Sequence, residues 1–233
     1  MMCRVVLILL CLLWGPAARG EGAVHASMEL HLVLAFDVSA SVNDAEFALQ
    51  RDGTAEAFRS FNVRAAIEGA PGGVAVSIVQ WSSIAQQAQG LAWAHLETPE
   101  DIDHFADQVA AMPRRLPGGG TMIHAGLRFA AEMFVTAPGT ARRQVIDLSG
   151  NGRTDDEAAL LEVRDRLNRQ GIVINALAVE EDHRDLTRYF SRVVIGGPGA
   201  FVETADDFPV FAKAIERKLY REINGPSYAG LQP

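Results

Sequence analysis

Cysteine, basic charge and long apolar runs are scarce in this sequence. Its two cysteines, Cys3 and Cys11, both lie near the N-terminus, so the rest of the chain offers no disulfide and no thiolate metal ligand. The 21 basic residues are outnumbered by 29 acidic ones, which gives a net charge of −8. This balance excludes a basic field for nucleic acid or for an anionic membrane surface. What is left is one soluble, acidic globular domain.

The first twenty residues have the pattern of a secretory signal peptide. Arg4 precedes the apolar run 5–14, which is too short to span a membrane as a helix, and small residues follow up to Gly20. We expect cleavage after Gly20 or, as the alternative, after Ala26, and an exported protein that is periplasmic or secreted. An uncleaved anchor is the other interpretation. No later apolar run reaches the roughly 20 residues of a membrane span, so no stable membrane insertion is expected after cleavage.

Apolar runs suited to buried strands alternate with segments of helical period in the rest of the chain. The pattern predicts strands over 28–36, 73–81, 86–93, 143–148 and 172–179, and helices over 43–61, 99–112, 121–135, 154–170 and 207–223. Strands that are apolar on both faces indicate an α/β fold, a doubly wound and mostly parallel sheet with helices on both faces. We expect one domain over 28–224 and a flexible tail over 225–233. In such folds ligands bind at the carboxyl ends of the strands.

The first predicted strand runs directly into Asp37-Val38-Ser39-Ala40-Ser41. Alternate side chains of an extended segment point the same way, so Asp37, Ser39 and Ser41 can present three oxygens to one point. Such hard oxygen ligands suit Mg²⁺ or Mn²⁺ and do not suit Zn²⁺. The structural alternative is that Asp37 makes a turn and that Ser41 caps the next helix.

Two further loops end in similar polar residues. Three glycines, 118–120, precede Thr121 at the start of a predicted helix, and Ser149-Gly150-Asn151-Gly152 follows a predicted strand. Glycines permit backbone conformations that larger residues cannot follow, so the first loop can deliver the Thr121 hydroxyl to the same edge. Thr121 as an ordinary helix cap is the alternative.

Together these three loops resemble the von Willebrand factor type A domain, and the match runs from about Leu30 to Ile223. The chain is similar to a bacterial branch of exported domains of unknown function in that family. In the family these segments form the metal-ion-dependent adhesion site. The resemblance therefore implies metal ligands at Asp37, Ser39, Ser41 and Thr121, with Asn151 at the fifth position.

Asn151 departs from the family pattern, which usually has Asp at this position. An amide oxygen can still coordinate a cation or hold a water, but it brings no charge. One carboxylate beside a divalent cation leaves a net charge of +1. We therefore expect lower metal affinity than in a site with two aspartates, and a stronger demand for an acidic group from a partner.

Asp147 lies within a strand that should be buried, where an ionised carboxylate is costly unless it is paired. One interpretation is structural, with Asp147 accepting from a backbone amide or pairing with Arg142 or Arg143. The other is that Asp147 compensates electrostatically for the neutral Asn151. The sequence favours the structural interpretation without deciding between them.

These observations favour a binding module that is not an enzyme. It would use a divalent cation to capture a protein or surface ligand that has an accessible carboxylate. One alternative is a relic of the adhesion site that binds no metal and serves as a protein-interaction scaffold. A second is a Mg²⁺-dependent phosphoryl-transfer enzyme with Asp37 as nucleophile, although such enzymes need a second Asp where this chain has Ser39. The sequence contains no phosphate-binding loop of the Gly-x-x-x-x-Gly-Lys type and no Gly-x-Ser-x-Gly elbow.

Overall fold

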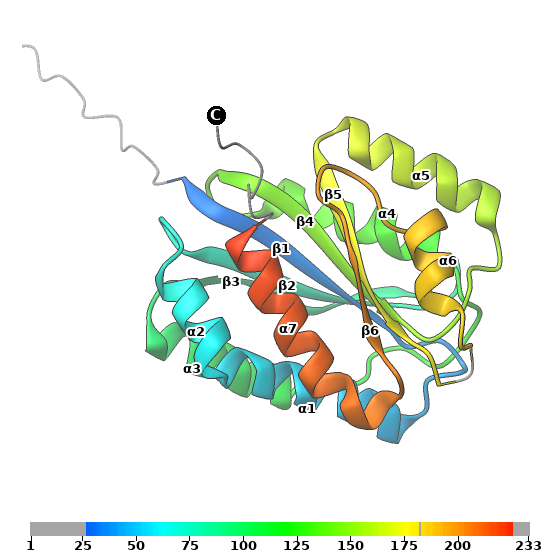
Figure 1. Cartoon of the computed structure of the whole chain (residues 1–233), viewed down its shortest axis with the longest axis horizontal. Coiled ribbons are helices and arrows are strands. Elements are labelled where there is room, and N and C mark those ends of the chain that lie inside the picture. Colours follow the sequence, from blue (N-terminus) through cyan, green and yellow to red (C-terminus); the bar gives the residue numbers. More distant parts are fainter. Residues whose placement is uncertain (1–26, 182, 226–233) are drawn as a thin grey trace, which may run out of the picture.

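The computed structural model describes residues 27–181 and 183–225, which form a six-stranded sheet between two layers of helices (Figure 1). The strand order is β3-β2-β1-β4-β5-β6, and every strand is parallel to its neighbour except β3, which is antiparallel to β2. The strands are β1 (Met28–Asp37), β2 (Val74–Trp81), β3 (Gln87–Leu96), β4 (Ala141–Gly150), β5 (Ile172–Val179) and β6 (Val202–Ala205). The predicted α/β class and mostly parallel sheet are confirmed. The predicted signal peptide, with its cleavage after Gly20 or Ala26, and the tail after Gly225 lie outside the described residues.

Helices cover both faces of the sheet (Figure 1). One layer contains α1 (Asp44–Arg59), α2 (Phe61–Glu68), α3 (Pro99–Ala110) and α7 (Phe211–Asn224), and the other contains α4 (Ile123–Met133), α5 (Glu157–Arg169) and α6 (Leu186–Val193). Short 3₁₀ helices at Phe134–Thr136 and Phe208–Val210 directly follow α4 and precede α7, respectively. Because each strand is covered on two sides, its sequence is apolar at nearly every position rather than at alternate ones.

The central strand β1 supplies both hydrophobic cores. Leu32 and Leu34 belong to the cluster under α1, α3 and α7, whereas Val33 and Ala35 belong to the cluster under α4, α5 and α6. All four side chains are buried. This alternation follows from the two-residue period of a strand, which sends successive side chains to opposite faces.

Two helices depart from the sequence-based prediction. The expected helix over 43–61 begins correctly, because Asn43 and Glu46 form a capping box, but it ends at Arg59. Ser60 has an extended backbone there, and its hydroxyl accepts from the amide of Val63 to begin the separate helix α2. Helix α6 was not predicted, although its buried residues Leu186, Phe190 and Val193 recur at helical spacing.

Arg143 joins the first strand to the last helix at the amino edge of the central strands. Its guanidinium lies 3.2 Å from Glu29 on β1 and donates to the carbonyl oxygens of Glu222 and Ile223, both at 2.8 Å. These carbonyls belong to the last turn of α7, where the helix leaves backbone acceptors unpaired and where positive charge is favourable. Arg142 pairs with the same Glu29 at 3.1 Å.

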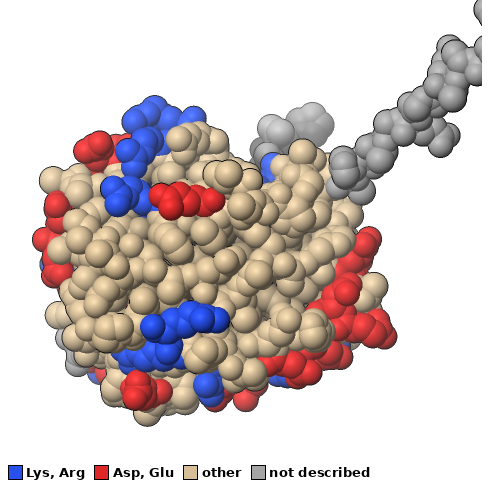
Figure 2. All heavy atoms as spheres, turned by 180° about the vertical axis from the view of Figure 1, so that it is seen from behind, with Lys and Arg blue, Asp and Glu red and all other residues tan. Residues whose placement is uncertain are grey.

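Charged side chains are dispersed on the face shown in Figure 2. The basic residues there form separate groups around a broad uncharged area, and acidic residues gather mainly along another part of the rim. Within residues 27–181 and 183–225, no helix is both long and apolar enough to cross a membrane.

Candidate functional site

The carboxyl end of β1 positions the first group of polar residues. Asp37 is the last residue of the strand, and its Oδ1 accepts a hydrogen bond of 2.7 Å from the amide of Ser39. The Ser39 hydroxyl lies 3.1 Å from that of Ser41. Asp37 and Ser39 are buried, whereas Ser41 is exposed. The three oxygens therefore form a connected set that runs from the sheet edge to the surface.

Asn151 joins this set from the loop after β4. The Ser41 hydroxyl donates to Asn151 Oδ1 at 2.8 Å, and Asn151 Nδ2 donates to the Ser41 carbonyl at 3.3 Å. Asn151 is buried, and these bonds fix which way its amide points. Segments 110 residues apart in the sequence thus meet at one point, as the parallel neighbours β1 and β4 require.

Asp37 has one oxygen with no partner. Its Oδ2 is buried and has no hydrogen bond of ordinary geometry from the described residues, and a Cβ atom on Gly150 would lie 3.1 Å from it. Burial raises the pKa of Asp37 to about 6, although Ser39 and the nearby backbone amide of Asn151 act in the opposite direction. A buried, unsatisfied carboxylate oxygen is costly, and a cation would remove that cost. The carboxylate and hydroxyl oxygens present here are the ligands that Mg²⁺ and Mn²⁺ prefer.

Thr121 approaches the same loop from the glycine-rich segment. The Gly119 carbonyl accepts from the amide of Ala40 at 2.9 Å, which ties this segment to the Asp37–Ser41 turn. A Cβ atom on Gly152 would lie 3.7 Å from the Thr121 hydroxyl, so Thr121 packs against the turn that follows Asn151. Thr121 is not a helix cap, because α4 begins at Ile123 with Met122 before it and no side-chain cap.

The structure therefore brings the three loops together. Asp37, Ser39, Ser41 and Asn151 form one hydrogen-bonded chain, and Thr121 lies beside the next residue, Gly152. The set contains a single carboxylate. Among the described residues no group of three or more His, Cys, Asp and Glu side chains could hold a metal ion, so any cation here would depend on hydroxyl and amide oxygens in addition to the Asp37 carboxylate.

Two supporting residues were not found from the sequence. Gln50 on α1 is buried; it donates to the Asp37 carbonyl at 3.2 Å and accepts from the Ser149 hydroxyl. Arg114 donates to the carbonyls of Val38 at 3.0 Å and Val42 at 2.8 Å. A polar residue inside the apolar side of a helix is a usable signal for Gln50, but no local pattern indicates that Arg114 returns to this loop.

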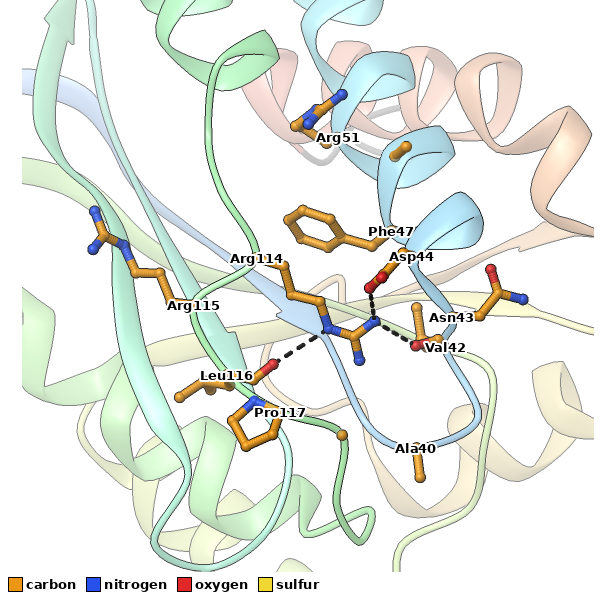
Figure 3. Close-up of a pocket in the computed structure, with 12 residues that line it drawn as sticks. Ala40, Val42, Asn43, Asp44, Phe47, Arg51, Arg114, Arg115, Leu116 and Pro117 are labelled. Carbon is orange, nitrogen blue, oxygen red and sulfur yellow. Dashed lines mark hydrogen bonds and ion pairs between the residues drawn. The ribbon is translucent and has the colours of Figure 1, made fainter.

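Arg114 forms the wall of an open groove next to the site (Figure 3). The groove has a volume of about 880 Å³, and Figure 3 shows the Arg114 guanidinium between Asp44, Val42 and Leu116. Ala40, which lies between Ser39 and Ser41, lines the end of the groove nearest the candidate site. The groove and the site therefore share a loop.

Asp147 does not belong to this group of residues. It lies 2.9 Å from the Nζ of Lys218 on α7, and both side chains are buried. The suggested pairing with Arg142 or Arg143 is wrong, because these two arginines lie beside Glu29 instead. The structural interpretation of Asp147 holds with a different partner: a buried lysine balances the buried carboxylate.

Comparison with known proteins agrees with the fold. Residues 27–227 match the family described as "Protein of unknown function (DUF1194)". No curated protein matches the chain.

Among solved structures, a von Willebrand factor domain of the type V pili tip protein Mfa5 from Porphyromonas gingivalis is 12% identical with a TM-score of 0.58, and the match covers 85% of this chain and 96% of that one. Manganese-loaded TRAP protein from Plasmodium vivax is 14% identical with a TM-score of 0.54, covering 85% and 74%. Proximal thread matrix protein 1 from the mussel byssus, with a zinc-occupied MIDAS motif, is 16% identical with a TM-score of 0.59, covering 84% and 48%. The present chain spans about half the length of the mussel protein. At these identities the likeness shows the fold.

Proposed function

Since this chain belongs to the DUF1194 family and has the von Willebrand factor A fold, we propose that it is an adhesion-type binding module rather than an enzyme. In this proposal Asp37, Ser39, Ser41, Thr121 and Asn151 hold a divalent cation, Mg²⁺ or Mn²⁺, as a metal-ion-dependent adhesion site. The bound cation supplies an electrophilic centre for an acidic group of a protein or surface ligand. The proposal includes export, with residues 1–20 removed as a signal peptide and the domain over 28–224 retained.

The unpartnered oxygen of Asp37 is the observation that supports this proposal most directly. It belongs to the only carboxylate of the set and is buried, and the other side chains of the set offer hydroxyl and amide oxygens. The structural neighbours with zinc in a MIDAS motif and with manganese bound support a divalent cation at this edge of the sheet.

The charge of the set indicates what kind of partner it would bind. With Asn151 in place of a second Asp, a divalent cation keeps a net charge of +1. Ser41 is exposed, so a ligand can reach the outer end of the set. A carboxylate from the partner would complete the shell and cancel the remaining charge, which is why the proposed ligand is acidic.

Calorimetric titration of the purified, metal-free protein with MnCl₂ and MgCl₂ tests the proposal. We expect heat from the wild type, and stronger binding in the presence of the peptide acetyl-Gly-Asp-Gly-amide than with its Gly-Asn-Gly counterpart. Asp37→Ala and Thr121→Ala should lose the signal. Thr136→Ala is the matched control, since the Thr136 hydroxyl bonds only to the Met133 carbonyl in its own turn.

Circular dichroism spectra establish that each variant is folded. A wild type that gives no heat with millimolar Mn²⁺ would overturn the metal site and leave the scaffold interpretation. Turnover of a phosphate ester that Asp37→Asn abolishes would instead support the phosphoryl-transfer alternative.

A further inference from the structure

The loop after β4 contains an acidic residue, Asp155, that is not among the five proposed ligands. Asp155 lies four residues after Asn151 and contacts Thr121 twice: its Oδ2 accepts from the Thr121 amide at 2.8 Å, and its own amide donates to the Thr121 carbonyl at 3.0 Å. A Cβ atom on Gly120 would lie 2.7 Å from the same carboxylate oxygen. The carboxylate of Asp155 therefore rests directly on the backbone of residues 120 and 121.

The loop thus encloses Thr121 from two sides. Gly152 packs against the Thr121 hydroxyl, and Asp155 holds its backbone amide and carbonyl. This arrangement fixes the residue that would contribute a neutral oxygen to the cation. It also places a carboxylate on the backbone amide of the residue that carries this oxygen.

The charges around the proposed metal site show why the position of Asp155 matters. The proposed ligands contain one carboxylate, and the positive charge of Arg114 near Asp37 acts on that carboxylate as well. Arg153, which lies in the β4–α5 loop itself, is paired with Asp185 at 2.5 Å. Asp155 is consequently the acidic side chain of the β4–α5 loop that contacts a proposed ligand.

We propose that Asp155 supplies, from the Thr121 side, part of the negative charge that Asn151 does not bring to the metal site. The inference rests on the proposed function and deepens it. Asp155 acts through its charge on the cation and by positioning Thr121, and it is not itself a ligand. The site then has two acidic residues of different kinds, one that coordinates and one that acts at longer range.

Titration with Mn²⁺ alone separates charge from position. Asp155→Asn keeps an oxygen that can accept from the Thr121 amide but removes the charge, whereas Asp155→Ala removes both. We expect Asp155→Asn to bind Mn²⁺ about fivefold or more weakly than the wild type at 50 mM NaCl, because an opposite charge near an exposed cation is worth about this much. The difference should shrink at 500 mM NaCl, since salt screens exposed charges and does not alter a hydrogen bond.

Asp156→Asn is the matched control. Asp156 is the next residue and is also exposed, and its carboxylate accepts from the Ala159 amide at the start of α5 without contacting Thr121. This variant carries the same change in net charge and should bind Mn²⁺ within about twofold of the wild type.

The same comparison in an Asn151→Asp background keeps the test decisive if wild-type binding is weak. We expect Asn151→Asp to bind more tightly than the wild type, and Asn151→Asp with Asp155→Asn to bind more weakly than Asn151→Asp alone. Absence of binding in both the wild type and Asn151→Asp would overturn the proposed function. Binding that Asp155→Asn leaves within twofold in both backgrounds, or that only Asp155→Ala weakens, would overturn the inference about charge while leaving the metal site intact.

Discussion

The Nζ of Lys218 lies 2.9 Å from Oδ1 of Asp147 and 4.8 Å from the centre of the Phe201 ring, with no exposed surface on the lysine side chain. Glu222, one helical turn further along α7, lies 2.7 Å from the same Nζ, and Asn175 donates to both of its carboxylate oxygens. One cation is therefore shared by two buried carboxyl groups. Burial raises the pKa of Asp147 to about 6, against the opposing effect of Lys218.

Lys218→Met should destabilise the protein by about 3–5 kcal/mol, because it leaves Asp147 and Glu222 buried together without a cation. Urea unfolding at pH 7.5, followed by circular dichroism, measures the change. Arg217→Met is the matched control: Arg217 pairs with Glu203 but is 58% exposed, so its removal should cost less than about 1 kcal/mol. An equal decrease in unfolding free energy for the two variants would show that the buried ion pairs of Lys218 stabilise the protein no more than a surface ion pair does.

Asp37→Asn should stabilise the metal-free protein at pH 7.5 by up to about 3 kcal/mol. In the unfolded chain the carboxyl of Asp37 has its ordinary pKa of 3.8, whereas burial in the folded state raises that pKa to about 6. Between these values the folded state holds the extra proton, so the contribution of Asp37 to stability falls as pH rises from about 4 through about 6.

The difference in unfolding free energy between Asp37→Asn and the wild type should therefore be smaller at pH 5 than at pH 7.5. Thermal unfolding in EDTA at both pH values measures it. A difference that is the same at pH 5 and pH 7.5 would contradict the raised pKa.

Arg114→Met should destabilise the protein by about 1–3 kcal/mol, because the carbonyls of Val38 and Val42 lose their donor. Arg114→Lys should recover less than half of this loss, since one ammonium group cannot replace the planar guanidinium fork. Arg115→Met serves as the control, because the Arg115 side chain is exposed and lies next to Arg114 in the chain. Urea unfolding in EDTA separates these variants, and full recovery by lysine would contradict the geometric argument.

Gly126→Ala should destabilise the protein by about 1–3 kcal/mol although alanine is the better helix former. An added Cβ at position 126 of α4 would lie 2.7 Å from Cγ of Trp81, a buried ring that cannot move aside. Gly152→Ala is the comparison, since its Cβ would meet nothing closer than 3.7 Å. Thermal unfolding of both variants tests this; a stabilised Gly126→Ala would mean that the α4–β2 contact is looser than described.

The parts of the fold that local sequence determines were predictable. Strand β5 occupies the predicted range 172–179, because seven apolar residues and the single polar Asn175 lie between a glycine and an acidic pair, a pattern typical of a strand buried on both faces. The start of α1 was predictable because Asn43 and Glu46 are close enough in sequence to cap it. The break at Ser60 was not predicted, since the apolar pattern of a helix continues through it, although the Ser60 hydroxyl caps the start of α2.

The candidate site was also predictable from the sequence only in part. Asp37, Ser39 and Ser41 could be grouped because they alternate at one strand end, and Asn151 could be added because parallel strands end at a common edge. Gln50 and Asp155 could not be assigned to the site in advance. Their contacts with the Asp37 carbonyl and the Thr121 amide depend on how a helix and a loop fold back over the edge of the sheet.

Arg143 brings both ends of the described domain to one place. It bonds to Glu29 at the start of β1 and to the last turn of α7, whereas Asp37 lies at the other end of the ten-residue β1, roughly 30 Å away. A tether attached through either end would consequently hold the domain at the edge of the sheet opposite the proposed metal site, and that site would face outward.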